Sequence, residues 1–240
     1  MGRDASQRPS ASGHASGGDG AARRQHGHGS RGGGSSRQQH GRASGGHAPN
    51  ARNPQAPKRN RPPHTLAKPV FFVGFMGAGK TSVSRRLARM CNISSIDLDT
   101  YLERREDRKV KDIFAEVGED GFRDIETAVL REFMAAEPQL VSCGGGIVKR
   151  PENRELLKRS GFVVYLKVSA DEAQSRISDL STRPLFNDIE AARAMNAERL
   201  PLYEEVADVV IDTAGKSVGR IAGEVKDLLK KKGILWQSHE

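Results

Sequence analysis

The sequence predicts an α/β domain in which helices cover both faces of a five-stranded parallel sheet, preceded by a disordered N-terminal tail. Three observations support this class. Short apolar runs alternate with amphipathic helical patterns from residue 69 onward, and that order requires crossover connections and parallel strands. A glycine-rich loop separates the first expected strand from the first expected helix. Residues 69–240 also have the length of one ordinary domain.

The first half of this domain begins with one strand and one helix. Residues 70–73 are apolar and β-favouring and are followed by glycine, which predicts a buried strand. Val83, Leu87 and Met90 recur at i, i+4 and i+7 between arginines, which predicts an amphipathic helix from near Lys80. A second strand is expected at 93–96, and helical patterns follow at 101–105, 110–117 and 125–133.

The second half supplies three more strands. Leu140 and Val141 precede three glycines and predict the third strand, and apolar runs at 162–166 and 209–211 predict the fourth and fifth. Helical patterns at 171–177 and 189–198 flank a polar stretch that contains Arg183. A one-faced pattern at 218–229 predicts the last helix. The alternation of strands and helices is thus complete, with no internal repeat.

Residues 1–68 differ in composition from the rest of the chain. They contain twelve Lys or Arg, two acidic residues and no aromatic residue, whereas residues 69–240 contain 27 basic and 28 acidic residues. Such a segment buries too little apolar surface to offset its backbone entropy. We therefore predict a disordered basic extension, rich in Gly, Ser, Arg and His, at 1–68 and a single globular domain at 69–240.

The tail allows two functional interpretations besides a solvated extension. Its Arg and Ser content is typical of an organelle transit peptide, which would place the protein in a plastid. Its charge could also bind nucleic-acid phosphates, weakly and nonspecifically because no aromatic side chain is present for base stacking. No apolar run is long enough to span a membrane, and Cys91 and Cys143 match no metal-site spacing. We expect a cytoplasmic protein, bacterial by default, with no membrane partner.

The segment from Gly74 to Thr81 matches the phosphate-binding loop G-x-x-x-x-G-K-[ST] and lies between a strand and a helix, as that loop must. In such a loop the backbone N–H groups surround phosphate, the lysine reaches the β- and γ-phosphates and the hydroxyl ligates Mg²⁺. The motif predicts ATP with Mg²⁺. The residues expected to contact ATP are Gly77, Ala78, Gly79, Lys80, Thr81 and Ser82.

Other polar residues are expected near the same strand ends, and each has a plainer alternative. Asp97 and Asp99 follow the second strand on one side, where one could join Mg²⁺ and the other hold an acceptor hydroxyl, or where they could cap a helix. Arg123 is interpretable as a surface arginine paired with Glu126. The three glycines at 144–146 permit close approach by a ligand but also suit a flexible turn.

Together these motifs resemble the shikimate kinase family. The chain also has F-R-x-x-E at 122–126, R-P-L at 183–185 and R-x-P-x-Y at 199–203, in the family's order. The resemblance covers residues 69–240 and implies a three-layer P-loop kinase fold similar to that of nucleoside monophosphate kinases. It implies transfer of the ATP γ-phosphate to the 3-hydroxyl of shikimate, which yields shikimate 3-phosphate for chorismate and aromatic amino-acid biosynthesis.

The resemblance also implies roles for individual residues. On the acceptor side, Arg123 and Arg199 would bind the shikimate carboxylate, and Asp99 would hold the ring hydroxyls and orient or deprotonate the attacking one. The backbone of Gly144, Gly145 and Gly146 would lie near the ring.

On the ATP side, Thr81 and Asp97 would hold Mg²⁺. Arg183 would close over ATP as part of a lid and act in catalysis with Lys80 and Asp99. Arg176 stands where the family stacks a residue near adenine, and Lys216 lies where the family often has an arginine near adenine.

Two other functions remain open from the sequence. One is a kinase for another small polyol such as gluconate, against which the combination of Asp99 with Arg123 and Arg199 weighs. The other is a nucleotide-regulated nucleic-acid-binding module that acts through the tail, against which the near-neutral charge of residues 69–240 weighs. For the kinase we expect a monomer with ATP and shikimate as its small-molecule partners.

Overall fold

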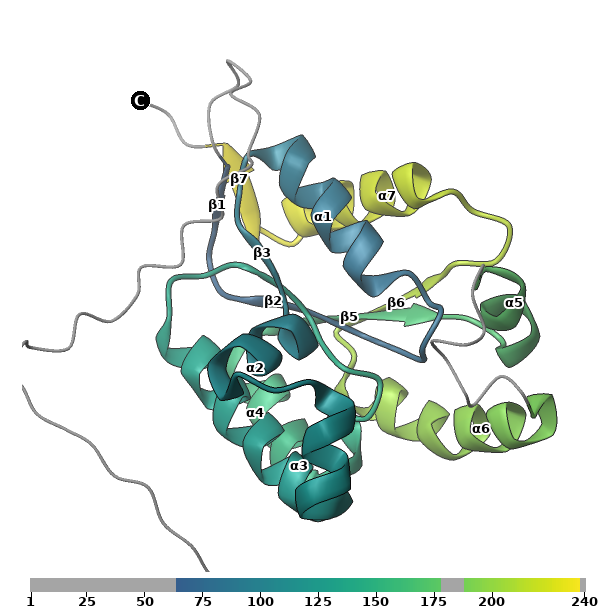
Figure 1. Cartoon of the computed structure of the whole chain (residues 1–240). Helices are drawn as coiled ribbons and strands as arrows, with labels where there is room; N and C mark the ends of the chain where they lie inside the picture. The colour runs from purple at the N-terminus through teal and green to yellow at the C-terminus, as the bar shows by residue number, and fades with distance from the viewer. Residues whose placement is uncertain (1–63, 178–187, 238–240) are drawn as a thin grey trace, which may run out of the picture. The chain divides into compact units, whose positions relative to one another are not determined.

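A parallel sheet of five strands forms the centre of the computed structural model, which describes residues 64–177 and 188–237 (Figure 1). The strands lie in the order β3-β4-β2-β5-β6. They are β2 (Val70–Val73), β3 (Ser95–Asp97), β4 (Leu140–Ser142), β5 (Phe162–Lys167) and β6 (Val209–Asp212). In the central strand β2, Val70 pairs with Leu140 on one side and Phe162 on the other. The predicted α/β class with five parallel strands is therefore confirmed.

Helices cover both faces of this sheet (Figure 1). Alternate side chains of β2 point to opposite faces, so Val70 and Phe72 join one core cluster and Phe71 and Val73 join the other. The first cluster includes buried residues of α1 (Lys80–Cys91) and α7 (Val218–Lys231), and the second includes α3 (Val110–Ala135) and α4 (Pro151–Ser160). The remaining helices are α2 (Leu98–Glu106), the 3₁₀ helix η1 (Ile147–Lys149), α5 (Ala170–Ser175) and α6 (Ile189–Val206).

The carboxyl ends of the strands bring the predicted motifs to one edge of the sheet. The loop 74–79 follows β2, Asp97 ends β3, and the three glycines at 144–146 follow β4. The strand order places β4 and β3 on one side of β2, and β5 and β6 on the other. Ligands of open α/β sheets bind at such a reversal of strand order, so the crevice beyond β2 is the expected site.

Several boundaries differ from the sequence prediction. The helices predicted at 110–117 and 125–133 belong to one element, α3, which bends at Gly118, where φ is 70° and ψ is −174°. β3 lies at 95–97 rather than 93–96, and α6 continues through Pro201 to Val206 rather than ending at 198. α4 was not predicted, because its buried side chains are confined to Asn153, Leu156 and Leu157.

A two-stranded antiparallel sheet lies outside the central sheet. β1 (His64–Leu66) pairs with β7 (Leu235–Gln237), and the paired residues Leu66 and Leu235 are both buried. His64 Nδ1 lies 3.1 Å from the carbonyl oxygen of Cys91 at the end of α1. The described structure thus begins before residue 69, where the sequence predicts the domain to start. Three residues are too few to show a strand pattern, and the basic composition around them indicated tail instead.

Residues 1–63, which make up most of the predicted tail, lie outside the described residues, so their disorder stays a prediction. Within the ranges 64–177 and 188–237, every helix is too short or too polar to cross a membrane.

Candidate active site

The phosphate loop curls between β2 and the first turn of α1. Gly77 has a φ of 79°, and a Cβ atom at this position would lie 2.8 Å from the Ala173 Cβ, so only glycine fits there. Lys80 is buried, and its Nζ donates hydrogen bonds to the carbonyl oxygens of Gly74 (2.7 Å) and Phe75 (2.9 Å). The amino group thus reaches back across the loop, where it and the N-terminus of α1 favour an anion.

Thr81, Asp97 and Ser142 gather their oxygen atoms beside this loop. Thr81 Oγ1 donates to Asp97 Oδ2 at 2.6 Å and lies 3.1 Å from Ser142 Oγ. The other oxygen, Asp97 Oδ1, accepts from the Thr100 backbone N–H at 3.1 Å and caps α2. The helix-cap interpretation of Asp97 is therefore confirmed, and its role toward Mg²⁺ stays a prediction. Ser142 was not predicted as part of this group, because it lies beside Asp97 only through the pairing of β3 with β4.

These oxygen atoms suit Mg²⁺. It prefers hard oxygen ligands and usually binds proteins through one or two side chains, keeping waters and substrate phosphates as its other ligands. The described ranges hold no group of three or more His, Cys, Asp or Glu side chains arranged to bind a metal ion. In a nucleotide complex, Thr81 and Asp97 would supply protein oxygens to Mg²⁺ and the phosphates would supply others.

Arg123 is buried rather than on the surface, contrary to one interpretation of the sequence. Its Nη1 donates to Glu126 Oε2 at 2.7 Å, and its Nη2 donates to Glu119 Oε1 at 3.2 Å. Glu119 in turn accepts from Lys149 Nζ at 2.5 Å. The guanidinium lies so close to Gly146 that a side chain there would overlap it. The predicted pairing with Glu126 is correct. Glu119, itself bound by Lys149, also holds the guanidinium in place.

Glu126 is the most enclosed carboxyl group of this cluster, with only 1% of the residue exposed. Burial raises its pKa to about 7 although Arg123 opposes the shift, and the nearby Asp99 carboxylate acts in the same direction as burial. A Cβ atom at Gly144 would lie 2.8 Å from Asp99 Oδ1 and 3.1 Å from Glu126 Oε1. Two carboxyl groups therefore lie close to Gly144, where any larger residue would collide with them.

Arg199 approaches the same loop from α6. It is 8% exposed, and its Nη1 lies 3.4 Å from the Gly145 carbonyl oxygen. Among the described residues its Nε has no hydrogen-bond partner. The three glycines thus adjoin Asp99, Arg123 and Arg199, to which the family resemblance gives roles in acceptor binding. A Cβ atom at Gly145 would also lie 3.7 Å from Met76 N, so this loop adjoins the phosphate loop.

The cations assigned to the adenine side bind different elements. Arg176 donates to the Thr213 carbonyl oxygen at 2.6 Å and to Glu172 Oε1 at 2.6 Å, so it fastens the loop after β6 to α5. Lys216 Nζ instead donates to Glu224 Oε2 of α7 at 2.8 Å. Ser82 is exposed on the first turn of α1. Arg183 lies outside the described residues, so its assignment to a lid stays a prediction.

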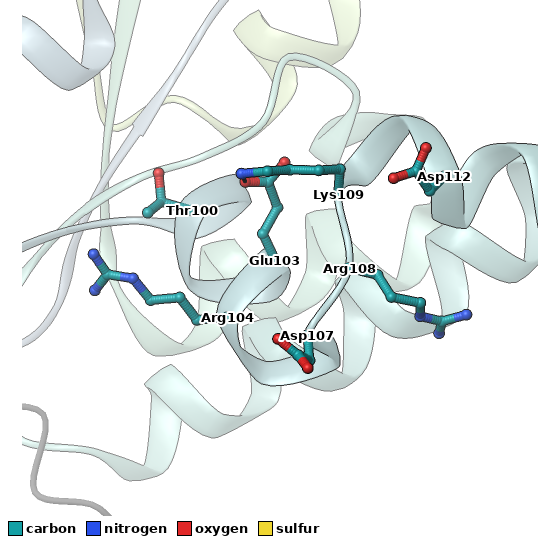
Figure 2. Close-up of a pocket in the computed structure, with 7 residues that line it drawn as sticks. All are labelled: Thr100, Glu103, Arg104, Asp107, Arg108, Lys109 and Asp112. Carbon is teal, nitrogen blue, oxygen red and sulfur yellow. Dashed lines mark hydrogen bonds and ion pairs between the residues drawn. The ribbon is translucent and has the colours of Figure 1, made fainter.

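A separate surface pocket of about 560 Å³ lies at the junction of α2 and α3 (Figure 2). Its lining is polar and charged and consists of Thr100, Glu103, Arg104, Asp107, Arg108, Lys109 and Asp112. Several of these charges already pair, since Lys109 Nζ contacts Glu103 at 3.0 Å and Arg108 contacts Glu116 at 2.5 Å. None of the residues assigned to ATP or acceptor binding lines this pocket.

The chain is similar to known proteins over about two thirds of its length. The family model described as shikimate kinase matches residues 76–230. The shikimate kinase of Cupriavidus pinatubonensis is 42% identical over 168 residues, which cover 69% of this chain and 88% of that protein. The shikimate kinase of Dictyoglomus turgidum is 39% identical over 166 residues, which cover 67% of this chain and 96% of that protein.

A solved structure, the shikimate kinase from Acinetobacter baumannii in complex with shikimate, is also similar. It is 34% identical, has a TM-score of 0.65 and covers 69% of this chain and 94% of its own. The family model, the relatives and the structural match agree with the motifs gathered at the carboxyl edge of the sheet, and the chain belongs to the shikimate kinase family.

Proposed function

We propose that the protein transfers the γ-phosphate of ATP to the 3-hydroxyl of shikimate. One observation carries the proposal. The glycine loop that touches Asp99, Arg123 and Arg199 also adjoins the phosphate loop, with the Gly145 Cβ position 3.7 Å from Met76 N. An acceptor held at the glycine loop would therefore lie beside the phosphates of a nucleotide. This adjacency is what an in-line transfer between two bound substrates requires.

The charges around the glycine loop suit a carboxylate attached to a polyol ring. Arg123 and Arg199 supply planar guanidinium groups, which bind carboxylates through paired N–H···O bonds. Asp99, in the first turn of α2, supplies an anionic acceptor for a ring hydroxyl. With the carboxylate held at the arginines and a hydroxyl held at Asp99, the ring has a single orientation toward the phosphate loop. Asp99 would orient the attacking hydroxyl and accept its proton.

On the donor side, Lys80 and the backbone of Gly77 to Gly79 would hold the β- and γ-phosphates. Thr81 and Asp97 would hold Mg²⁺, which neutralises developing phosphate charge when bound. Ser142 supports this arrangement through its contact with Thr81. The protein itself forms no covalent bond in this scheme, because positioning and charge stabilisation account for catalysis of phosphoryl transfer.

We infer that ATP and shikimate are the small-molecule partners and that the enzyme works as a monomer in the bacterial cytosol. Both relatives described above are bacterial proteins. Cys91 and Cys143 are free and buried, as suits a reducing compartment.

The function is tested by coupled ADP release from the full chain with MgATP, with shikimate or gluconate as acceptor. We expect ADP release that depends on shikimate and that gluconate does not support. ATP hydrolysis unaffected by shikimate would leave the phosphate loop as a nucleotide site but remove the acceptor role of Asp99, Arg123 and Arg199. A preference for gluconate would assign the chain to another polyol.

The role of Asp97 in Mg²⁺ binding can be separated from its role as a helix cap. Asparagine caps helices as well as aspartate does, so Asp97→Asn should leave the free energy of unfolding within about 0.5 kcal/mol of wild type. It removes the negative charge beside Thr81, so we expect the Mg²⁺ concentration for half-maximal activity to rise about tenfold or more.

Titration of activity with Mg²⁺ at fixed ATP measures this change, and thermal unfolding measures stability. Asp188→Asn is the matched control, because Asp188 caps α6 through the Ala191 N–H and is assigned no role in binding Mg²⁺. An unchanged Mg²⁺ requirement in Asp97→Asn would rule out Asp97 as a metal-binding group.

A further inference from the structure

Tyr203 is a buried residue of α6 to which the proposed reaction assigns no role. Its relative exposure is 0%, and its hydroxyl donates a hydrogen bond of 2.5 Å to the Gly145 carbonyl oxygen. Arg199 lies four residues earlier on the same face of the helix, and its Nη1 is 3.4 Å from the same oxygen. The middle carbonyl of the glycine loop is thus shared between an arginine assigned to the acceptor and a tyrosine.

The glycine loop has no side chains of its own with which to hold its position. The carbonyl oxygens of Gly144 and Gly146 accept from the backbone N–H groups of Ile147 and Lys149, within the following 3₁₀ turn. The Gly145 carbonyl oxygen instead accepts from side chains of α6. Tyr203 therefore provides the shorter of the two hydrogen bonds that tie the middle of this loop to another element.

The orientation of Gly145 decides how closely the neighbouring side chains approach the acceptor. Before it in the chain, Gly144 adjoins Asp99, and after it Gly146 adjoins Arg123, since a Cβ atom at either glycine would overlap that side chain. A rotation of the peptide at Gly145 would shift both contacts and would also move the oxygen that Arg199 approaches. Catalytic geometry is sensitive to such small displacements of a supporting loop.

We propose that Tyr203 is a positioning residue for the acceptor site. Its hydroxyl fixes the Gly145 carbonyl, and through it the arrangement of Asp99, Arg123 and Arg199 in which shikimate binds. This inference rests on the proposed function, and it assigns Tyr203 no contact with substrate.

The packing of Tyr203 does not by itself require a hydroxyl. Its ring stacks on that of Tyr165, with centroids 5.2 Å apart and an interplanar angle of 26°, and a phenylalanine ring would make the same contact. Burial raises the pKa of Tyr203, which keeps the hydroxyl protonated and therefore able to donate. A buried hydroxyl is costly unless it is hydrogen-bonded, so its bond to Gly145 is what makes tyrosine favourable here.

The stacked pair offers a matched control. Tyr203→Phe and Tyr165→Phe each remove one hydroxyl oxygen from the same pair of rings. The Tyr165 hydroxyl makes no hydrogen bond within the described parts of the chain, and Tyr165 belongs to β5 rather than to the acceptor loop. Steady-state kinetics and thermal unfolding are measured for the full-length wild type and both variants, and the Kd of shikimate is measured by calorimetry.

We expect Tyr203→Phe to raise the KM and the Kd of shikimate about tenfold, the size of effect that loss of one hydrogen bond to a buried group produces. The KM of ATP should stay within about twofold of wild type, because the phosphate loop keeps its own contacts. Tyr165→Phe should leave both constants unchanged. A change in shikimate affinity without a matching change in ATP affinity is not expected from a purely structural role.

Three outcomes would overturn the inference. In the first, Tyr203→Phe binds shikimate as tightly as Tyr165→Phe does. In the second, it weakens ATP and shikimate equally. In the third, it fails to fold while Tyr165→Phe folds, which would make the hydroxyl a stability element. Absence of shikimate-dependent turnover in the wild type would instead refute the proposed function itself, so the two failures are distinguishable.

Discussion

Lys80→Met should lower kcat about 10³-fold while the protein remains folded. Methionine retains much of the length of the buried stem but lacks the charged donor. In the structure the Lys80 amino group lies 2.7 Å from the Gly74 carbonyl oxygen and 2.9 Å from that of Phe75, at the opening where phosphate would bind. The charge that develops on the transferring phosphoryl group needs such a preorganised donor, and loss of one donor of this kind costs about 10²–10³ in rate.

Coupled ADP release at saturating shikimate measures the loss in Lys80→Met. Lys230→Met is the control, since Lys230 is an exposed lysine of α7 and its replacement should leave kcat unchanged. Thermal unfolding of both variants separates lost chemistry from lost structure. A kcat within threefold of wild type in Lys80→Met would contradict the assignment of this lysine to the phosphates.

Arg123→Ala should lower kcat/KM for shikimate by about 10³-fold or more, with little change in the KM of ATP. The arginine is 7% exposed, packs against Gly146 and is fixed by Glu126 and Glu119. Its planar guanidinium is therefore preorganised to bind a carboxylate, and charge-assisted hydrogen bonds of this kind are stronger than neutral ones. Arg123→Lys keeps the charge but cannot make paired N–H···O bonds to a carboxylate, so we expect kcat/KM for shikimate to fall about 10–100-fold.

Stability must be measured alongside activity for this residue. Removing Arg123 leaves the Glu126 carboxyl buried without its ion-pair partner, and breaking such a pair costs about 3–5 kcal/mol. Arg131→Ala is the control on the same helix, because Arg131 forms an exposed ion pair with Glu152 of α4. Shikimate turnover that is unchanged in a folded Arg123→Ala would exclude the proposed carboxylate site.

The parts of the site that the sequence predicted are those with local patterns. The phosphate loop is contiguous, and its function follows from eight successive positions between a strand and a helix. Asp97 and Asp99 could be placed because they lie at a strand end, Asp97 as the last residue of β3 and Asp99 in the first turn of α2. The pairing of Arg123 with Glu126 follows from helical spacing alone. In each case the chemistry lies within one element or at its end, where sequence spacing and spatial spacing agree.

The parts that could not be predicted depend on contacts between distant elements. Ser142 lies beside Asp97 through the register of β3 with β4, and it meets Thr81 because α1 packs next to β4. Lys149 of η1 reaches Arg123 of α3 through Glu119 of α3. Tyr203 is the last residue of the R-x-P-x-Y motif, but its hydrogen bond to Gly145 depends on the packing of α6 against the loop after β4. Sequence patterns give the face on which a residue lies but not the atom that it contacts.

Because β1 pairs with β7, the first and last strands of the described structure lie side by side. His64 lies opposite Gln237, and opposite residues of antiparallel strands have α-carbons about 4.5–5.5 Å apart. A short linker could therefore join these two positions, and new termini could be opened in the exposed segment between α3 and β4, near Glu137. We therefore expect a circularly permuted chain, joined and cut at these positions, to form the same strand pairings.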